Sequence, residues 1–154
     1  MDRKEKIKEL KRKNEISIIC KSWKEKGIDI SSDNFLDLDE TLFIQKEIIK
    51  VMDEMDEHSK SLVYGKDKEK TVNIYKQEIL RIVDDNYEYI FFVKEATKHG
   101  AIKLCGKILK DNVDFIISES ELFNGACCIF CCSKSIEKGL CAWLGEYDDR
   151  IYIW

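Results

Sequence analysis

The chain has 154 residues and a formal net charge of −4 at pH 7, with 44% hydrophobic and 36% charged residues. This length suffices for one domain with its own core, and this balance is that of a globular rather than a disordered chain. No apolar run approaches the roughly 20 residues of a membrane span. The lysine-rich N-terminus also lacks the apolar segment of a secretory signal. We therefore expect a single cytoplasmic domain, residues 1–154.

Charge is distributed unevenly along the chain. Residues 1–26 hold ten Lys/Arg and five Asp/Glu, a formal +5, whereas the remainder carries −9. Within the acidic part, residues 29–60 contain ten acids and three bases. Because phosphate binding requires a basic face, we do not expect nucleic acid to be a partner of most of this chain. A protein with a basic surface is the favoured partner. The basic N-terminal helix leaves a nucleic-acid-associated protein as an alternative.

The first half of the chain is predicted to be helical. Apolar residues at helical spacing indicate a helix from about Arg3 to Lys26, and Gly27 is typical of the position just past a helix end. Residues 1–15 have few apolar anchors, so we expect a basic extension that frays. A second helix is expected to follow Asp39, and the apolar repeat at residues 72–82 predicts a third.

The second half changes to a strand-like pattern. The aromatic and β-branched stretch YEYIFFV predicts a strand at residues 87–93. Further strands are predicted at residues 101–105, 113–117, 126–132, 140–145 and 150–154. The last two form a hairpin around the turn EYDD, and successive short strands favour antiparallel pairing. The predicted class is therefore α+β, with N-terminal helices packed on one face of a mainly antiparallel sheet formed by the C-terminal half.

Four cysteines crowd the stretch ACCIFCC, namely Cys127, Cys128, Cys131 and Cys132. A zinc site needs about four ligands in a tetrahedron. The intervening Ile and Phe favour an extended backbone, which points Cys128 and Cys131 to opposite faces. A redox CxxC motif lies at a helix N-terminus, a context that this stretch lacks. We interpret the cluster as a central strand buried on both faces, without a cofactor, and keep a zinc or thiol protein as the alternative.

The remaining residues form no recognisable catalytic motif. Cys20, Cys105 and Cys141 stand alone, and His58 and His99 have no partner at ligand spacing. The sequence contains neither a phosphate-binding glycine loop nor a nucleophile elbow. We therefore expect a protein that is not an enzyme.

Two acidic stretches are the candidate sites for a protein partner. The first surrounds the start of the second predicted helix and comprises Asp29, Asp33, Asp37, Asp39 and Glu40. The second is the C-terminal hairpin turn and comprises Glu146, Tyr147, Asp148 and Asp149. Carboxylates beside aromatic rings suit a hot spot for a basic partner, although both stretches also fit ordinary capping and turn chemistry. If the final strand lies at a sheet edge, a homodimer through the C-terminal strand is a further interpretation.

Three segments carry a resemblance to a known class of proteins. A Lys/Glu-rich opening, KEKIKELKRKNE, leads into an acidic helical half, YIFFV begins the strands, and the hairpin WLGEYDDRIYIW ends the chain. This plan resembles small bacterial immunity proteins of polymorphic-toxin and contact-dependent inhibition systems, the YxiF-like group among them. The resemblance implies a cytoplasmic, non-enzymatic inhibitor that binds and neutralises one cognate toxin domain, often a nuclease.

Overall fold

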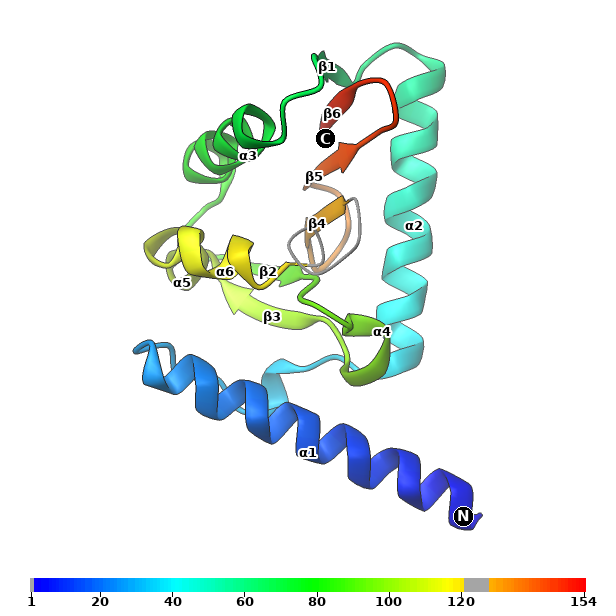
Figure 1. The fold of residues 1–154 in the computed structure, drawn as a ribbon, viewed down its shortest axis with the longest axis vertical. Coiled ribbons are helices and arrows are strands. Elements are labelled where there is room, and N and C mark those ends of the chain that lie inside the picture. Colours follow the sequence, from blue (N-terminus) through cyan, green and yellow to red (C-terminus); the bar gives the residue numbers. More distant parts are fainter. Residues whose placement is uncertain (1, 121–127) are drawn as a thin grey trace.

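The structure is a computed structural model that describes residues 2–120 and 128–154. Six strands form one sheet in the order β1-β6-β5-β4-β2-β3, and every neighbouring pair is antiparallel (Figure 1). The strands are β1 (Leu62–Tyr64), β2 (Glu88–Phe91), β3 (Ile102–Cys105), β4 (Cys128–Ser133), β5 (Gly139–Leu144) and β6 (Asp149–Ile153). The predicted α+β class and the mainly antiparallel sheet are therefore confirmed.

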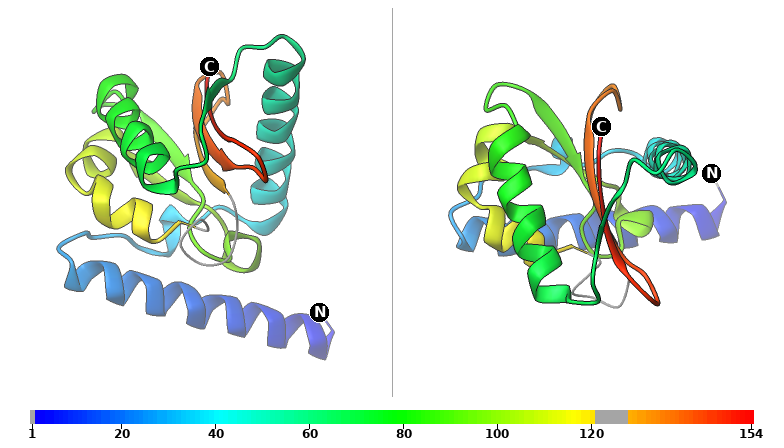
Figure 2. Two further views of the ribbon diagram at one scale, coloured as in Figure 1. Left: turned by 45° about the horizontal axis from the view of Figure 1, so that its top comes forward. Right: turned by 90° about the horizontal axis from the view of Figure 1, so that it is seen from above.

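Helices cover both faces of this sheet and not only the one face that the sequence predicted (Figure 2). The helices are α1 (Arg3–Glu25), η1 (Ser32–Asn34), α2 (Leu38–Glu57), α3 (Lys68–Ile82), α4 (Ala96–His99), α5 (Gly106–Asp111) and α6 (Val113–Ser118). One hydrophobic core contains residues of α2, α4 and one sheet face. The other contains residues of α1, α3, α5, α6 and the opposite face. Burial of alternate strand residues on each side requires both layers.

The three long helices begin and end near the predicted positions. α1 is continuous from Arg3, and Gly27 follows it at a φ of 81° that favours glycine. Within the part of α1 expected to fray, the Arg12 guanidinium donates hydrogen bonds to the carbonyl oxygens of Leu36 and His99, at 3.0 and 3.1 Å. α2 begins before Asp39, because the preceding Asp37 is the residue that caps it.

The predicted strand at residues 113–117 is wrong, because this segment forms α6. Val113, Ile116 and Ile117 stand at positions i, i+3 and i+4, so a helix turns all three toward the core of the α3 face. That burial outweighs the strand propensity of β-branched residues. The predicted strand at residues 126–132 is confirmed from Cys128 onward, and its first two residues lie outside the described part.

Among the described residues, no helix combines the length and the apolar composition needed to cross a bilayer.

Candidate functional site

Cys128, Cys131 and Cys132 of the cysteine cluster lie in β4, which is a central strand between β2 and β5. Cys128 and Cys132 belong to the core on the α2 face, whereas Cys131 belongs to the core on the α3 face. Burial raises the pKa of Cys131 and raises that of Cys132 to about 12, which keeps both as unreactive thiols. No group of His, Cys, Asp and Glu in the described part could hold a metal ion. The buried-strand interpretation is confirmed for these three residues, and Cys127 lies outside the described part.

The two histidines contact backbone carbonyl groups. The His99 side chain is buried, with Nδ1 at 2.9 Å from the oxygen of Gly100 and Nε2 at 2.7 Å from that of Lys94. Nδ1 of His58, the residue that follows α2, lies 2.7 Å from the oxygen of Glu54. The contacts of His99 connect neighbouring parts of the chain, and that of the exposed His58 is local to the end of α2.

The C-terminal hairpin turns at Glu146 and Tyr147. Gly145 closes the turn by donating its backbone N–H to the Asp148 carbonyl oxygen at 2.8 Å. The Tyr147 side chain is 85% exposed at the tip, and Glu146 beside it is also exposed. The turn is therefore shorter than the predicted EYDD, and the next residue, Asp149, is already part of β6.

Asp149 is buried and anchors the hairpin to the start of α3. Its side chain is only 1% exposed. Oδ2 accepts hydrogen bonds from the Thr71 hydroxyl at 3.0 Å and from the Asp67 backbone N–H at 3.1 Å. Oδ1 lies 3.6 Å from Nζ of Lys66, an ion-pair distance rather than a hydrogen bond. Asp149 was predicted to contact a partner, but its burial assigns it to the framework beneath the hairpin.

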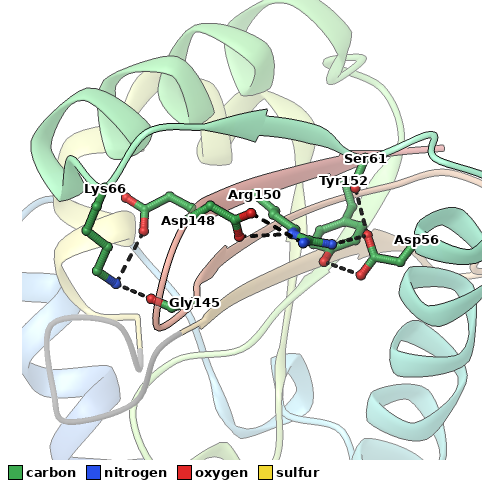
Figure 3. A network of polar contacts seen from close by, with 8 residues as sticks. Asp56, Ser61, Lys66, Gly145, Asp148, Arg150 and Tyr152 are labelled. Carbon is green, nitrogen blue, oxygen red and sulfur yellow. Dashed lines mark hydrogen bonds and ion pairs between the residues drawn. The ribbon is translucent and has the colours of Figure 1, made fainter.

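Arg150 connects the hairpin to the end of α2 (Figure 3). Its Nη1 lies 3.0 Å from Oδ1 of Asp56, and its Nε and Nη2 donate to the two carboxylate oxygens of Asp148 at 3.1 and 3.3 Å. Asp56 also accepts hydrogen bonds from the hydroxyl groups of Tyr152 at 2.9 Å and Ser61 at 2.6 Å. Because the planar guanidinium contacts one carboxylate from α2 and one from the hairpin, it holds these two elements in a fixed arrangement.

The network shifts the pKa values of Asp56, Tyr152 and Arg150. Partial burial acts to raise the pKa of Asp56, but hydrogen bonds from Ser61 and Tyr152 and the contacts with Arg150 outweigh burial and lower it. Burial and the hydrogen bond to Asp56 raise the pKa of Tyr152. Hydrogen bonds to Asp148 and Asp56 raise the pKa of Arg150. The Asp56 carboxylate thus stays ionised and the Tyr152 phenol stays neutral at neutral pH.

A cleft of about 360 Å³ lies between α2 and the hairpin, and we call it the hairpin cleft. It is lined by Ile49, Met52, Asp53, Asp56, Trp143, Gly145, Glu146, Tyr147, Asp148, Arg150 and Tyr152. Four of these residues are acidic and one is basic, a formal charge of −3. Trp143, 37% exposed, and Tyr147 add accessible aromatic surface. The hairpin cleft therefore offers carboxylates and aromatic rings together.

The structure keeps the two predicted acidic stretches apart. The first stretch lies at and before the start of α2, and the hairpin cleft lies beside the end of α2. Asp56 follows Asp39 by 17 positions, which corresponds to about 25 Å along the helix. The side chains of the first stretch are all exposed. Asp53 and Asp56 were missed by sequence reasoning. Their helical spacing was visible, but only the packing of α2 beside β6 brings them to the hairpin.

The structure also bears on the predicted homodimer and on the nucleic-acid alternative. β6 pairs with β5 on one side and with β1 on the other, so the C-terminal strand is not the edge that the predicted homodimer needs. The basic part of α1 lines a groove of about 600 Å³, in which lysines alternate with Glu5, Glu9 and Glu15. This mixture of charges does not favour phosphate binding, and the nucleic-acid alternative stays a prediction.

Comparison with known proteins adds no assignment, because no family model, curated protein or solved structure matches this chain. The resemblance to immunity proteins therefore rests on the sequence plan alone. The chemistry of the hairpin cleft is the basis on which a function can be proposed.

Proposed function

We propose that this protein is a cytoplasmic, non-enzymatic inhibitor that binds and neutralises a cognate toxin domain with a basic surface. The observation that carries this proposal is the hairpin cleft, where exposed Tyr147 and Trp143 stand among four carboxylates. Aromatic side chains are enriched in binding hot spots, and a surrounding acidic rim steers a basic partner toward them. The resemblance to immunity proteins points to the same kind of partner.

Preorganisation of the hairpin cleft supports this role. Arg150 holds Asp56 and Asp148 in place, so few additional side chains would lose conformational freedom when a partner binds. The charges of Asp53 and Glu146 remain at the surface on the two sides of the cleft. A basic nuclease fits this arrangement, because a nuclease must itself carry cationic side chains to hold nucleic acid.

The experiment is a native pull-down from the source cells with tagged protein, eluted by a salt step. We expect one stoichiometric basic protein in the eluate, because charge steering is screened beyond roughly 10 Å at 0.1 M salt. Expression of that protein alone should arrest growth, and co-expression of this chain should restore growth. The double variant Glu146→Gln, Tyr147→Ala should lose the protein and the rescue.

The matched control is Asp39→Asn, which removes one exposed carboxylate from the other acidic stretch and should bind as the wild type does. A partner that survives the salt step, or that is retained equally by the double variant, would contradict binding at the hairpin cleft. Recovery of nucleic acid, lost on deletion of residues 1–15, would instead support the nucleic-acid alternative.

A further inference from the structure

The two edges of the sheet differ in how they are covered. At the β3 edge, Phe35 pairs with Ile102, and the Asn34 side chain donates to the Lys103 carbonyl oxygen at 3.0 Å. At the opposite edge, β1 pairs with β6, and no described strand lies on its outer side. The β3 edge is therefore blocked by the chain itself, whereas the β1 edge is open.

The register identifies the open backbone groups of β1. Gly139 and Trp154 exchange both backbone hydrogen bonds across β5 and β6, at 3.0 and 3.1 Å. Such pairs alternate along an antiparallel ladder, so Asp149 and Ile151 turn their backbone groups toward β1. Their partners are Tyr64 and Leu62. The residue between those two, Val63, consequently points its N–H and C=O away from the sheet.

The side chains of this edge are apolar and accessible. Leu62 is 44% exposed and Val63 is 57% exposed, while Tyr64 packs partly into the core on the α3 face. Edge strands that avoid pairing with other chains are commonly very short, as the three-residue β1 is, or carry lysine, proline or a bulge. β1 has no lysine or proline between Leu62 and Tyr64. Within residues 2–120 and 128–154, the edge has both the outward backbone groups and the apolar surface that strand pairing uses.

We propose that the β1 edge pairs with the β1 edge of a second copy of this chain, antiparallel and centred on Val63. In this register the two Val63 residues exchange their outward N–H and C=O groups. Leu62 then lies opposite Tyr64 of the second copy, so an exposed apolar side chain covers a half-buried ring. This contact repeats on the other side of the two-fold axis, as an isologous dimer requires.

The residues that flank β1 are compatible with this register. Ser61 lies opposite Gly65 of the second copy, which has no side chain to clash. Lys60 and Lys66 lie outside β1, and the chain bends at Ser61 and Lys66, so the register does not set the two lysines directly opposite each other. The Lys66 ammonium group already contacts the Asp149 carboxylate and the Gly145 carbonyl oxygen, which balances its charge. Like-charge repulsion across the axis is therefore reduced.

The pairing has a consequence for the hairpin cleft. Val63 lies opposite Arg150, and Arg150 lies opposite Trp143, so these three side chains share the α2 face of the sheet. A two-fold axis through an antiparallel pair runs perpendicular to the sheet, so the α2 faces of both copies lie on the same side of the joined sheet. The dimer would therefore present both hairpin clefts on one face. The pairing itself does not depend on the proposed inhibitor function.

The test is sedimentation equilibrium of the full chain, from about 10 µM to about 1 mM, with three proteins compared. A three-residue strand buries less than a standard interface, so the wild type should dimerise reversibly with a Kd on the order of 100 µM. Val63→Pro removes the outward N–H and spares both bonds to β6, as edge prolines do. It should stay monomeric, and the control Val63→Thr should dimerise like the wild type.

Amide hydrogen exchange of the wild type provides a test that needs no variant. Exchange at Val63 should slow as the protein concentration rises, whereas Leu62 and Tyr64, bonded to β6, should exchange slowly throughout. A wild type that is monomeric at the highest concentration overturns the proposal. The proposal is also overturned if Val63→Pro still dimerises, or if the exchange rate at Val63 does not depend on protein concentration.

Discussion

The burial of Asp149 predicts a large loss of stability when its carboxylate is removed. In Asp149→Ala, the fully buried Thr71 hydroxyl and the Asp67 backbone N–H lose their shared acceptor. Each hydrogen bond to a charged acceptor contributes about 1.5–3 kcal/mol, and the uncovered donors carry a desolvation cost. The contact with half-exposed Lys66 adds little. We therefore expect the free energy of unfolding to fall by about 3–5 kcal/mol.

The neighbouring carboxylate provides the matched comparison. Asp148 is partly exposed, and its partner Arg150 keeps a second carboxylate, Asp56, when Asp148 is removed. Asp148→Ala should therefore lower the free energy of unfolding by less than about 1 kcal/mol. Equilibrium unfolding in urea with a common slope measures both values, and Asp149→Ala should also melt roughly 10 °C lower than the wild type. Equal losses in the two variants, or a loss below about 1 kcal/mol in Asp149→Ala, would refute the assignment of Asp149 to the framework.

Three further predictions follow from particular residues. Because the pKa of Asp56 is lower in the folded than in the unfolded protein, ionised Asp56 stabilises the fold at pH values above the unfolded pKa. This contribution is lost as the pH falls through the folded pKa. In Asp56→Asn, the free energy of unfolding should therefore decrease less between about pH 5 and pH 2 than it does in the wild type. Burial shields the Cys132 thiol and raises its pKa to about 12, so at pH 8 almost none of it is the reactive thiolate. Mass spectrometry after iodoacetamide treatment should therefore find the more accessible, half-buried Cys105 labelled long before Cys132, and comparable rates would contradict the packing of β4. Gly27→Ala should lower the free energy of unfolding by about 1 kcal/mol, because residues with a side chain disfavour a φ of 81°. An added Cβ would meet no other atom of the described residues within 4 Å, so the backbone conformation is the only source of this cost. Gly100→Ala should cost at least twice as much in the same urea assay, because its Cβ would also collide with a backbone carbonyl oxygen.

The sequence by itself determined those features that depend on local repetition. Helical spacing predicted α1, α2 and α3, and two strand-like stretches on either side of the turn EYDD predicted the hairpin of β5 and β6. The extended preference of Ile129 and Phe130 separated Cys128 from Cys131, which the two cores confirm. These patterns depend on the period of a single element, so a single chain segment carries enough information to predict them.

The tertiary structure decided every feature that depends on a neighbour distant in sequence. α6 is a helix because its apolar side chains find the core of the α3 face, and β1 is a strand because β6 offers it a partner. Asp149 looked identical to Asp148 in the sequence, yet one carboxylate is buried under α3 and the other faces Arg150. Burial and pairing arise from packing between elements, and no local pattern specifies which side chains that packing covers.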